Sequence, residues 1–285
     1  MAFGYIKYSR DENMGIVGFL KRLMGKSKIE KLPGFGDDGF LITLPYGKYE
    51  ENIKLRERAN KNIFKFLENM DIEFISGEEN INYPYGFKLC KGNLLKGAFA
   101  EEIIKDISQK ENVYIENTSL VIKDGGDEGS VYAIEAAAKA AGEMAVFTER
   151  QKGIENLIED IYFDTGLSIS LFSYEESDYI KESMFIVSCK KNENNEKALK
   201  KGSIYLFLFG KDQKAQELYE KRKDINVYYN PEFTFNGKNE KASVIEAYLL
   251  SSMMKHYNDK KRVSLKEYAI QNAVKYAEIK ALKAL

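Results

Sequence analysis

A regular alternation of apolar strands and helices begins near residue 112, and it constrains the fold of this chain more than any other feature. Its strand candidates are nearly continuous apolar runs: SLVIK (119–123), EMAVFT (143–148), LSISLF (167–172), MFIVSC (184–189), IYLFLF (204–209) and INVYY (225–229). Helical stretches separate several of them, most plainly residues 130–141 and 151–162. Strands have this composition when helices cover both faces of a parallel sheet. We therefore predict an α/β fold with a doubly wound, mostly parallel sheet over residues 112–255.

Residues 1–111 predict a smaller α/β domain that precedes this sheet. Its strand candidates are FGYIKYS (3–9), FLITL (40–44) and IEFIS (72–76), and its helix candidates span residues 15–28, 52–70 and 95–109. The basic segment 15–28 has an apolar stripe that we expect to pack on the sheet of this domain, although such a helix can also lie on a membrane surface. A chain of 285 residues is longer than one hydrophobic core usually spans, so two domains are expected.

The end of the chain predicts two helical segments, over residues 241–255 and 264–284. In the second segment, apolar and aromatic residues recur at three-to-four spacing: Leu265, Tyr268, Ala269, Ala273, Tyr276 and Ile279. We predict that residues 256–285 form a C-terminal helix that returns to the first domain and packs on it.

The stretch IKDGGDEGSV (122–131) follows a strand candidate and precedes a helix candidate. A dinucleotide-binding G-x-G-x-x-G turn stands in that position, so that a phosphate can rest at the positive end of the helix. Gly126 and Gly129 occupy the second and third glycine positions, while Asp124 replaces the first glycine and has Gly125 beside it. We therefore predict a Rossmann-like nucleotide-binding domain with its phosphate turn at these residues.

The letters GGDE in this turn also begin the signature of enzymes that make cyclic dinucleotides. That signature continues with Phe or Tyr inside a β-hairpin. Here Gly129 follows Glu128 and leads into SVYAIEAAAKAAG, a strong helix pattern that leaves no returning strand. The dinucleotide interpretation is therefore preferred.

The second strand candidate ends in FTER, which places Glu149 about 20 residues beyond the glycine turn. An acid in this position hydrogen-bonds the adenine ribose of NAD, whereas Arg150 beside it could meet the 2′-phosphate of NADP. The predicted cofactor is therefore NAD or NADP. Its predicted binding residues are Asp124, Gly125, Gly126, Gly129, Glu149 and Arg150.

The same turn carries acids at Asp124, Asp127 and Glu128. Asp127 and Glu128 suit the start of a helix, because acids there complement the macrodipole and cap free N–H groups. Their charges, with that of Asp124, would also repel a diphosphate. The alternative is therefore a degenerate Rossmann protein that has lost its cofactor and acts without catalysis as a binding or assembly module.

The chain from residue 119 to residue 150, together with ESMFIVSCK (182–190), KKGSIYLFLFGKD (200–212) and IEAYLLSSM (245–253), resembles a known kind of enzyme. It is similar to the two-domain Rossmann-type NAD(P)-dependent dehydrogenases of the shikimate dehydrogenase and glutamyl-tRNA reductase kind. The resemblance covers about residues 112–255 and implies that IVSCK (186–190) faces the nicotinamide. Residues 1–111 carry none of the substrate motifs expected from shikimate dehydrogenases, so no catalytic residue is transferred from that family.

Other side chains are candidates for chemistry or substrate contact. Cys189 ends an apolar strand where a Rossmann active site would lie, so it is either a nucleophile or a small buried residue. Cys90 is a weaker candidate, and His256 fits a helix C-terminus at the surface. Pro–Gly–Tyr loops and the stretch YNPEF (229–233) offer further contacts to a cleft or are ordinary turns: Tyr46, Lys48, Tyr85, Lys88, Asn230 and Glu232.

Composition excludes several classes of function. The 43 basic and 44 acidic residues leave a net charge of −1, which gives no electrostatic reason to expect a nucleic-acid partner. The single histidine and the two cysteines, which form no CxxC pair, offer no metal-ligand spacing, so no metal is expected. No apolar run approaches the roughly 20 residues of a membrane span, and the first residues lack a signal-peptide core. We therefore expect a cytoplasmic protein without a membrane partner.

Two functional hypotheses follow. The first is an NAD(P)-dependent oxidoreductase-like protein of unknown substrate, with a small molecule bound in the cleft between its domains. The second is the degenerate Rossmann module. An exposed sheet edge or helix would allow a homodimer under either hypothesis, and no sequence feature selects one.

Overall fold

The chain folds into two compact units in the computed structural model. The described residues are 2–9, 26–47, 51–78, 86–173, 180, 182–190, 199–210, 212–255 and 264–284. Unit 1 comprises Met1–Gly92 and Glu240–Asn272, and unit 2 comprises Asn93–Asn239 and Ala273–Leu285. These boundaries differ from the predicted 1–111, 112–255 and 256–285. The difference arises because residues 93–110 pack on the helix over residues 128–138 of unit 2, and because Ala273–Leu285 belong to unit 2 and not to unit 1.

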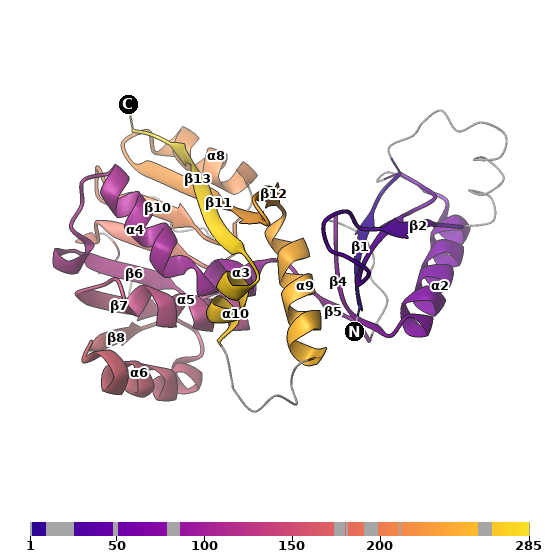
Figure 1. Cartoon of the computed structure of the whole chain (residues 1–285). Helices are drawn as coiled ribbons and strands as arrows, with labels where there is room; N and C mark the ends of the chain where they lie inside the picture. Colours follow the sequence, from indigo (N-terminus) through magenta and orange to yellow (C-terminus); the bar gives the residue numbers. More distant parts are fainter. Residues whose placement is uncertain are drawn as a thin grey trace. The chain divides into compact units, whose positions relative to one another are not determined.

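Unit 1 is built on a five-stranded sheet with the order β2-β3-β1-β4-β5 (Figure 1). All neighbouring strands run parallel except β2, which is antiparallel to β3. The strands are β1 (Ala2–Lys7), β2 (Lys28–Lys31), β3 (Gly39–Thr43), β4 (Ile72–Gly77) and β5 (Lys88–Leu89). The strands predicted over 3–9, 40–44 and 72–76 are confirmed.

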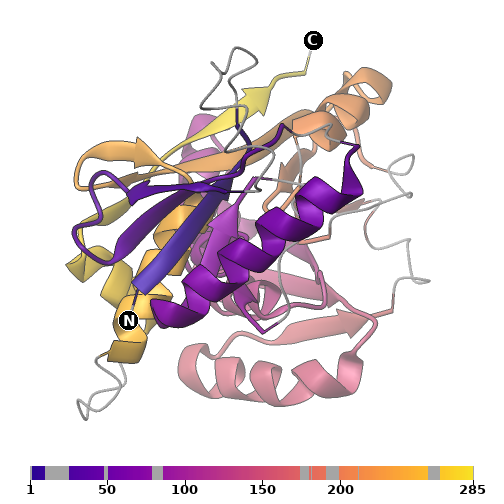
Figure 2. The same ribbon diagram turned by 90° about the vertical axis from the view of Figure 1, so that its right-hand side faces the viewer.

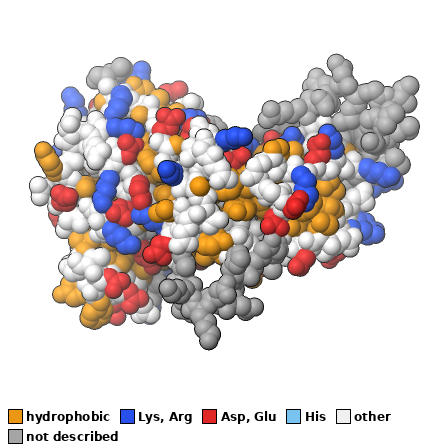
Figure 3. Space-filling view, in the orientation of Figure 1, with side chains coloured by type: hydrophobic (Ala, Val, Ile, Leu, Met, Phe, Trp, Pro, Cys, Tyr) orange, Lys and Arg blue, Asp and Glu red, His pale blue; other side chains and the backbone are white. Residues whose placement is uncertain are grey.

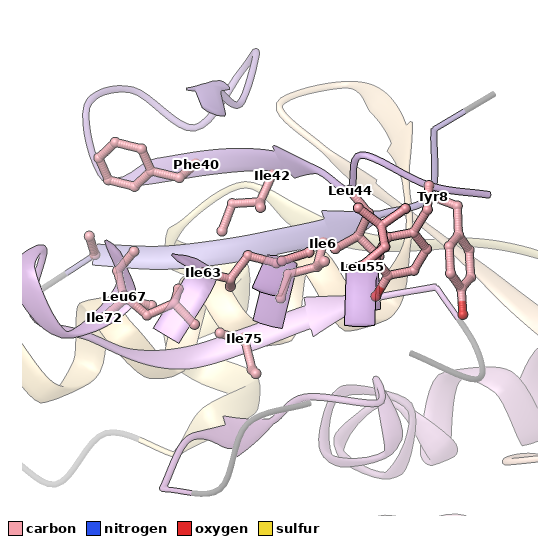
Figure 4. Packing of buried hydrophobic residues seen from close by; sticks show 13 residues of the cluster. Ile6, Tyr8, Phe40, Ile42, Leu44, Leu55, Ile63, Leu67, Ile72 and Ile75 are labelled. Atoms are coloured by element: carbon pink, nitrogen blue, oxygen red, sulfur yellow. The ribbon is translucent and has the colours of Figure 1, made fainter. Parts of the chain in front are cut away.

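Helix α2 (Ile53–Asn69) lies across one face of this sheet (Figure 2), as the apolar stripe of residues 52–70 predicts. Side chains from α2 and from the strands form a single apolar cluster (Figure 4), in which Ile63 and Leu67 of the helix meet Ile6 and Ile42 of the strands. Burying each such side chain contributes roughly 1.5–3 kcal/mol to folding. This cluster is the main core of unit 1.

The opposite face of the sheet is covered by α9 (Ala242–Lys255), which is followed by α10 (Leu265–Gln271). Phe3 of β1 points to this side, where its ring centroid lies 5.4 Å from that of Phe35 and 6.0 Å from that of Tyr248 in α9. Unit 1 therefore has three layers, with its sheet between α2 and α9.

Unit 2 contains an eight-stranded sheet. Seven of its strands follow the order β12-β11-β10-β9-β6-β7-β8, and the eighth, β13, pairs with β11. The strands from β8 to β11 are parallel, and their spatial order is that of a doubly wound dinucleotide-binding sheet, 3-2-1-4-5-6. The predicted Rossmann-like fold is thereby confirmed. The strands are β6 (Ser119–Lys123), β7 (Glu143–Phe147), β8 (Ile169–Phe172), β9 (Phe185–Ser188), β10 (Ile204–Phe207), β11 (Asn226–Phe235), β12 (Lys238–Glu240) and β13 (Val274–Leu282).

Among the helices of unit 2, α3 and α5 pack unusually closely. The described helices of unit 2 are α3 (Asn93–Ala98), α4 (Ala100–Lys110), η1 (Ile115–Asn117), α5 (Glu128–Ala138), α6 (Gln151–Thr165) and α8 (Asp212–Lys221). The helix predicted over 95–109 is divided at Phe99 into α3 and α4. Gly97 of α3 lies directly against the backbone of Gly129 at the start of α5, an approach that only glycine permits.

The C-terminal helix predicted over 264–284 is wrong. Ser264 begins α10 with a capping box, but Ala273 has a φ of 57° and the chain continues as β13. This strand runs antiparallel to the whole length of β11, and the Tyr276 hydroxyl donates to Asp106 Oδ2 over 2.6 Å. Tyr276 and Ile279 fit helical spacing, yet their backbone pairs with β11, a segment distant in the sequence that local spacing does not reveal. Only α9 and α10 of this region belong to unit 1.

No helix among the described residues has the length and apolar character needed to cross a membrane. The helix predicted over residues 15–28 lies almost entirely outside the described part of the chain.

The close approach of α3 and α5 predicts that Gly97→Ala destabilises unit 2. A methyl group there would overlap the Gly129 carbonyl oxygen and lie 3.1 Å from the Ala133 amide nitrogen. Because helix backbone cannot rotate away, we expect the free energy of unfolding to fall by about 1–3 kcal/mol. Urea unfolding followed by circular dichroism measures this loss.

Gly153→Ala in α6 is the matched control, because the nearest atom to its methyl group would be Arg150 Cβ at 3.9 Å. That change should be neutral or stabilise the helix by up to about 1 kcal/mol. Equal unfolding curves for the two variants would contradict the close packing of α3 on α5.

Candidate functional site

The glycine turn lies at the carboxyl end of β6, at the point where the strand order reverses between β6 and β9. Gly126 has a φ of 80°, a left-handed conformation that lets the chain turn from the strand into α5. Gly125 lies against the carbonyl oxygen of Cys189 at the end of the neighbouring strand, so no side chain fits there. The turn therefore occupies the position where ligands of doubly wound sheets bind.

Asp127 is the N-cap of α5, as its place in the sequence predicts. Its Oδ1 accepts hydrogen bonds from the Ser130 amide over 3.0 Å and from Ser130 Oγ over 2.9 Å. Its Oδ2 accepts one from Asn93 Nδ2, at the start of α3, over 2.9 Å. The carboxylate of Asp127 is therefore used to hold the start of α5 and to join it to α3.

The second acid of the turn, Asp124, is buried and paired with Arg150. Its side chain is 1% exposed, and that of Arg150 is 35% exposed. Arg150 Nε lies 2.8 Å from Asp124 Oδ2, and one terminal nitrogen of its guanidinium lies 2.9 Å from Oδ1. This two-point geometry is the strongest arrangement of an arginine and a carboxylate.

Two further donors contact Asp124. The Gly126 amide donates to Oδ1 over 2.9 Å, and Thr148 Oγ1 donates to Oδ2 over 2.7 Å. Thr148 also accepts a hydrogen bond from the Arg150 amide over 3.0 Å. Each oxygen of the buried carboxylate thus has two donors, as a charge removed from water requires.

These contacts decide the protonation state of Asp124. Burial raises the pKa of its carboxyl group, but the hydrogen bonds from Arg150, Gly126 and Thr148 outweigh burial and hold this pKa below its ordinary value. The hydrogen bond with Asp124 raises the pKa of Arg150, although burial lowers it. Both groups are therefore charged at neutral pH, and the pair adds no net charge to the turn.

Arg150 also reaches the backbone of the turn, where its guanidinium donates to the Asp127 carbonyl oxygen over 3.1 Å. Its side chain therefore crosses from the end of β7 to the turn after β6. The predicted ribose contact, Glu149, forms an ion pair with Lys190: its side chain is 78% exposed, and Lys190 Nζ lies 3.0 Å from its Oε1.

The expected repulsion of a diphosphate by Asp124, Asp127 and Glu128 needs correction. The charge of Asp124 is neutralised by Arg150, and Asp127 accepts hydrogen bonds through both oxygens. Glu128 alone presents an exposed carboxylate of the three. What stands at the phosphate turn is therefore an internal ion pair and not three free acids.

The end of β9 lies beside this turn and brings Cys189 next to it. The Cys189 amide donates to the Lys123 carbonyl oxygen over 2.9 Å, and its side chain is buried. Lys123, just before the turn, is buried as well, and its Nζ lies 3.3 Å from the Tyr205 hydroxyl. Among the described residues, no cluster of His, Cys, Asp and Glu side chains has an arrangement that could hold a metal ion.

The other candidates named from the sequence have structural contacts of their own. Tyr46 is buried against Tyr8 in the core of unit 1, and Lys88 forms an ion pair of 2.7 Å with Glu73. Cys90 is buried, and burial raises the pKa of its thiol well above the ordinary range. Lys48, Tyr85 and His256 lie outside the described residues.

The last two candidates named from the sequence, Asn230 and Glu232, lie in β11. Asn230 has a φ of 52° where the pairing of β11 with β13 shifts register, and Glu232 Oε1 lies 3.6 Å from Lys280 Nζ of β13. These contacts give both residues a place in the strand pairing.

Sequence reasoning missed four residues that lie around the turn: Asn93, Ser130, Thr148 and Lys190. Thr148 could have been found, because the parallel register of β6 with β7 places the residue after Phe147 beside Asp124. Ser130 stands three residues after the cap, where a hydroxyl can bond the capping carboxylate. Asn93 gave no signal, because its role depends on how α3 packs on α5.

Comparisons with known proteins find similar solved structures. A shikimate 5-dehydrogenase from Listeria monocytogenes in complex with shikimate and NAD is 10% identical, covers 95% of this chain and 96% of its own, and has a TM-score of 0.39. A quinate dehydrogenase from Corynebacterium glutamicum in complex with NAD is 8% identical, with 95% and 99% covered and a TM-score of 0.41. An L-tryptophan dehydrogenase from Nostoc punctiforme is 11% identical, with 95% and 80% covered and a TM-score of 0.39.

No protein-family model and no curated protein matches the chain. Shikimate dehydrogenases, which the sequence resembles, are thus among the structures that match. The fold of this chain follows from its own strand order.

The burial of Asp124 predicts unequal effects when the pair is broken from either side. Arg150→Ala leaves a buried carboxylate without its cation and should cost about 3–5 kcal/mol of stability at pH 7. Asp124→Asn should cost less, about 1–3 kcal/mol, because the half-exposed Arg150 can return to water. Urea unfolding measures both.

The same pair predicts a pH dependence. Because the pKa of Asp124 is lowered by folding, its contribution is present above the unfolded pKa of about 3.9 and is lost as pH falls through the folded value. The stability difference between the wild type and Asp124→Asn should therefore shrink below about pH 4. A difference that stays constant down to pH 2 would contradict the ionised pair.

Proposed function

We propose that this chain is an oxidoreductase-like Rossmann protein whose dinucleotide turn is held closed by its own Asp124–Arg150 pair, and that it acts as a binding or assembly module without NAD(P)-dependent catalysis. The observation that carries the proposal is the two-point contact of Arg150 with the buried Asp124. Sites of this fold place the pyrophosphate on the turn after the first strand and the ribose beside the end of the second strand. Arg150 joins those two places, so its side chain takes space that ribose and phosphate need.

The energetics support a closed turn. A nucleotide that displaced Arg150 would leave the carboxylate of Asp124 buried without its cation, at a cost of about 3–5 kcal/mol. Since each 1.4 kcal/mol corresponds to a tenfold change in affinity, binding would weaken by roughly two to three and a half powers of ten. Arg150 also donates to the Asp127 carbonyl oxygen, and that bond would be lost as well.

A second candidate function is an NAD(P)-dependent oxidoreductase in which Arg150 leaves Asp124 and meets the 2′-phosphate of NADP. The place of the turn favours this candidate, because it lies where the strand order reverses and where the positive end of α5 begins. Its cofactor-binding residues would be Asp124, Gly125, Gly126, Gly129, Glu149 and Arg150. The substrate would be a small molecule, and Cys189 would lie beside the cofactor.

A thermal-shift experiment with NAD, NADP, their reduced forms and ATP separates the two candidates. For the wild type we expect no change in melting temperature at millimolar nucleotide. The double variant Asp124→Gly with Arg150→Ala restores a glycine at the first position and frees the space over the turn. Nucleotide at 100 times its Kd should then stabilise that variant by about 2.7 kcal/mol, or roughly 5–10 °C.

Gly153→Ala serves as the control for unspecific effects in the same region, because it leaves the pair intact. A clear shift of the wild type with NADP, lost in Arg150→Ala, would overturn the closed-turn proposal and establish the second candidate. No shift in the double variant would mean that the pair is not what excludes the nucleotide.

A further inference from the structure

Two neighbouring aromatic side chains lie exposed in the last turn of α6. Phe163 is 82% exposed and Tyr162 is 54% exposed, and their ring centroids lie 6.2 Å apart in an edge-to-face arrangement. Single exposed apolar residues are common on protein surfaces, but adjacent exposed aromatics of this size are typical of surfaces that bind a partner. We call these residues and the acids around them the α6 face.

Acidic side chains surround the aromatic pair. Helix α6 carries exposed acids and a single lysine, Lys152; the acids are Glu155, Glu159, Asp160 and Asp164. Glu135 of the neighbouring helix α5 adds to them: burial raises its pKa, Lys139 lowers it, and Asp160 and Asp164 raise it further. Figure 3 shows hydrophobic and acidic side chains next to each other over α6, at the lower left. The α6 face is therefore both aromatic and negatively charged.

The α6 face stands at one end of the sheet of unit 2. Helix α6 packs on β8, which is the last strand of the sheet order on that side. In the part of the chain that the structure describes, no strand pairs with the outer edge of β8. A partner that approaches α6 therefore meets no other described strand at that edge.

Charge decides between two kinds of partner. A second copy of this chain, placed with its α6 antiparallel to the first, would bring the acids of both helices together with only one Lys152 from each. Like charges at an interface disfavour such a pairing. A basic amphipathic helix instead offers lysines and arginines to the acids, and its apolar side chains can cover Tyr162 and Phe163.

We propose that the α6 face docks a basic amphipathic helix of a partner protein. The inference goes beyond the proposed role of the glycine turn, because it concerns a different surface and holds whether or not the turn binds a nucleotide. Phe163 and Tyr162 supply the apolar anchor, and the acids of α6 select a cationic partner and orient it.

A peptide of suitable chemistry tests the proposal with the full chain. A synthetic peptide with leucines at helical spacing and lysines on the opposite face has this chemistry and is not part of this chain. A fluorescent form of this peptide is titrated with the protein while anisotropy is measured. We expect micromolar binding that weakens as salt is raised, because exposed charges are screened.

Variants of the α6 face should weaken the peptide's binding. Tyr162→Ser with Phe163→Ser removes the anchor, and Glu159→Lys with Asp160→Lys reverses the charge; each pair should raise the Kd about tenfold or more. Tyr114→Ser is the matched control, because this tyrosine of unit 2 is 76% exposed and lies outside α6. It should leave the Kd within about twofold. A peptide whose cationic residues are replaced by glutamine should bind at least about tenfold more weakly.

Three results would overturn the proposal. The first is no binding of the peptide to the wild type, and the second is equal binding by the wild type and both α6 variants. The third is a wild-type dimer in light scattering that Phe163→Ser converts to a monomer, which would make a second copy the occupant of the face. Nucleotide binding is measured separately, so a failure here leaves the closed-turn proposal untouched, and the reverse holds as well.

Discussion

The buried carboxylate of Asp124 is the constraint on which the arrangement of the glycine turn depends. A charge taken out of water must be paired and hydrogen-bonded, and the nearby chain supplies donors for this purpose. Arg150 folds back from the end of β7, Thr148 turns its hydroxyl inward, and Gly126 takes a left-handed conformation that aims its amide at the carboxylate. The turn therefore has the shape of a phosphate site but is filled by the protein's own charges.

The start of α5 is held by a second set of internal contacts. Asp127 caps the helix and binds Asn93 of α3, while Gly97 and Gly129 let the two helix backbones touch. These contacts use polar groups that a nucleotide site would offer to its ligand. They also join the start of α5 to α3. These contacts give the region a structural role, and the α6 face lies outside it.

The sequence allowed β1, β3 and β4 of the first sheet, the six parallel strands of the second, the helix over 52–70 and the location of the glycine turn to be predicted, since each depends on local apolar periodicity or on glycine. The pairing of Asp124 with Arg150 was not predicted, because the residues are distant in the chain and meet only when β6 and β7 align in register. The exposed aromatics of α6 were not predicted either. Their exposure depends on which side of the helix the sheet covers, and Tyr162 and Phe163 follow a buried Ile161.

The amino-acid sequence alone determined three features. They are the α/β class, the parallel sheet around β6 and the turn with acids at 124, 127 and 128. Local rules were enough there, because alternation and turn chemistry act over a few residues. The folded chain was needed to show that Asp124 and Asp127 are held by internal contacts and that residues 274–282 form a strand. Both outcomes rest on partners far away in the sequence: the guanidinium of Arg150 neutralises Asp124, and the open edge of β11 binds the last strand where local spacing favoured a helix.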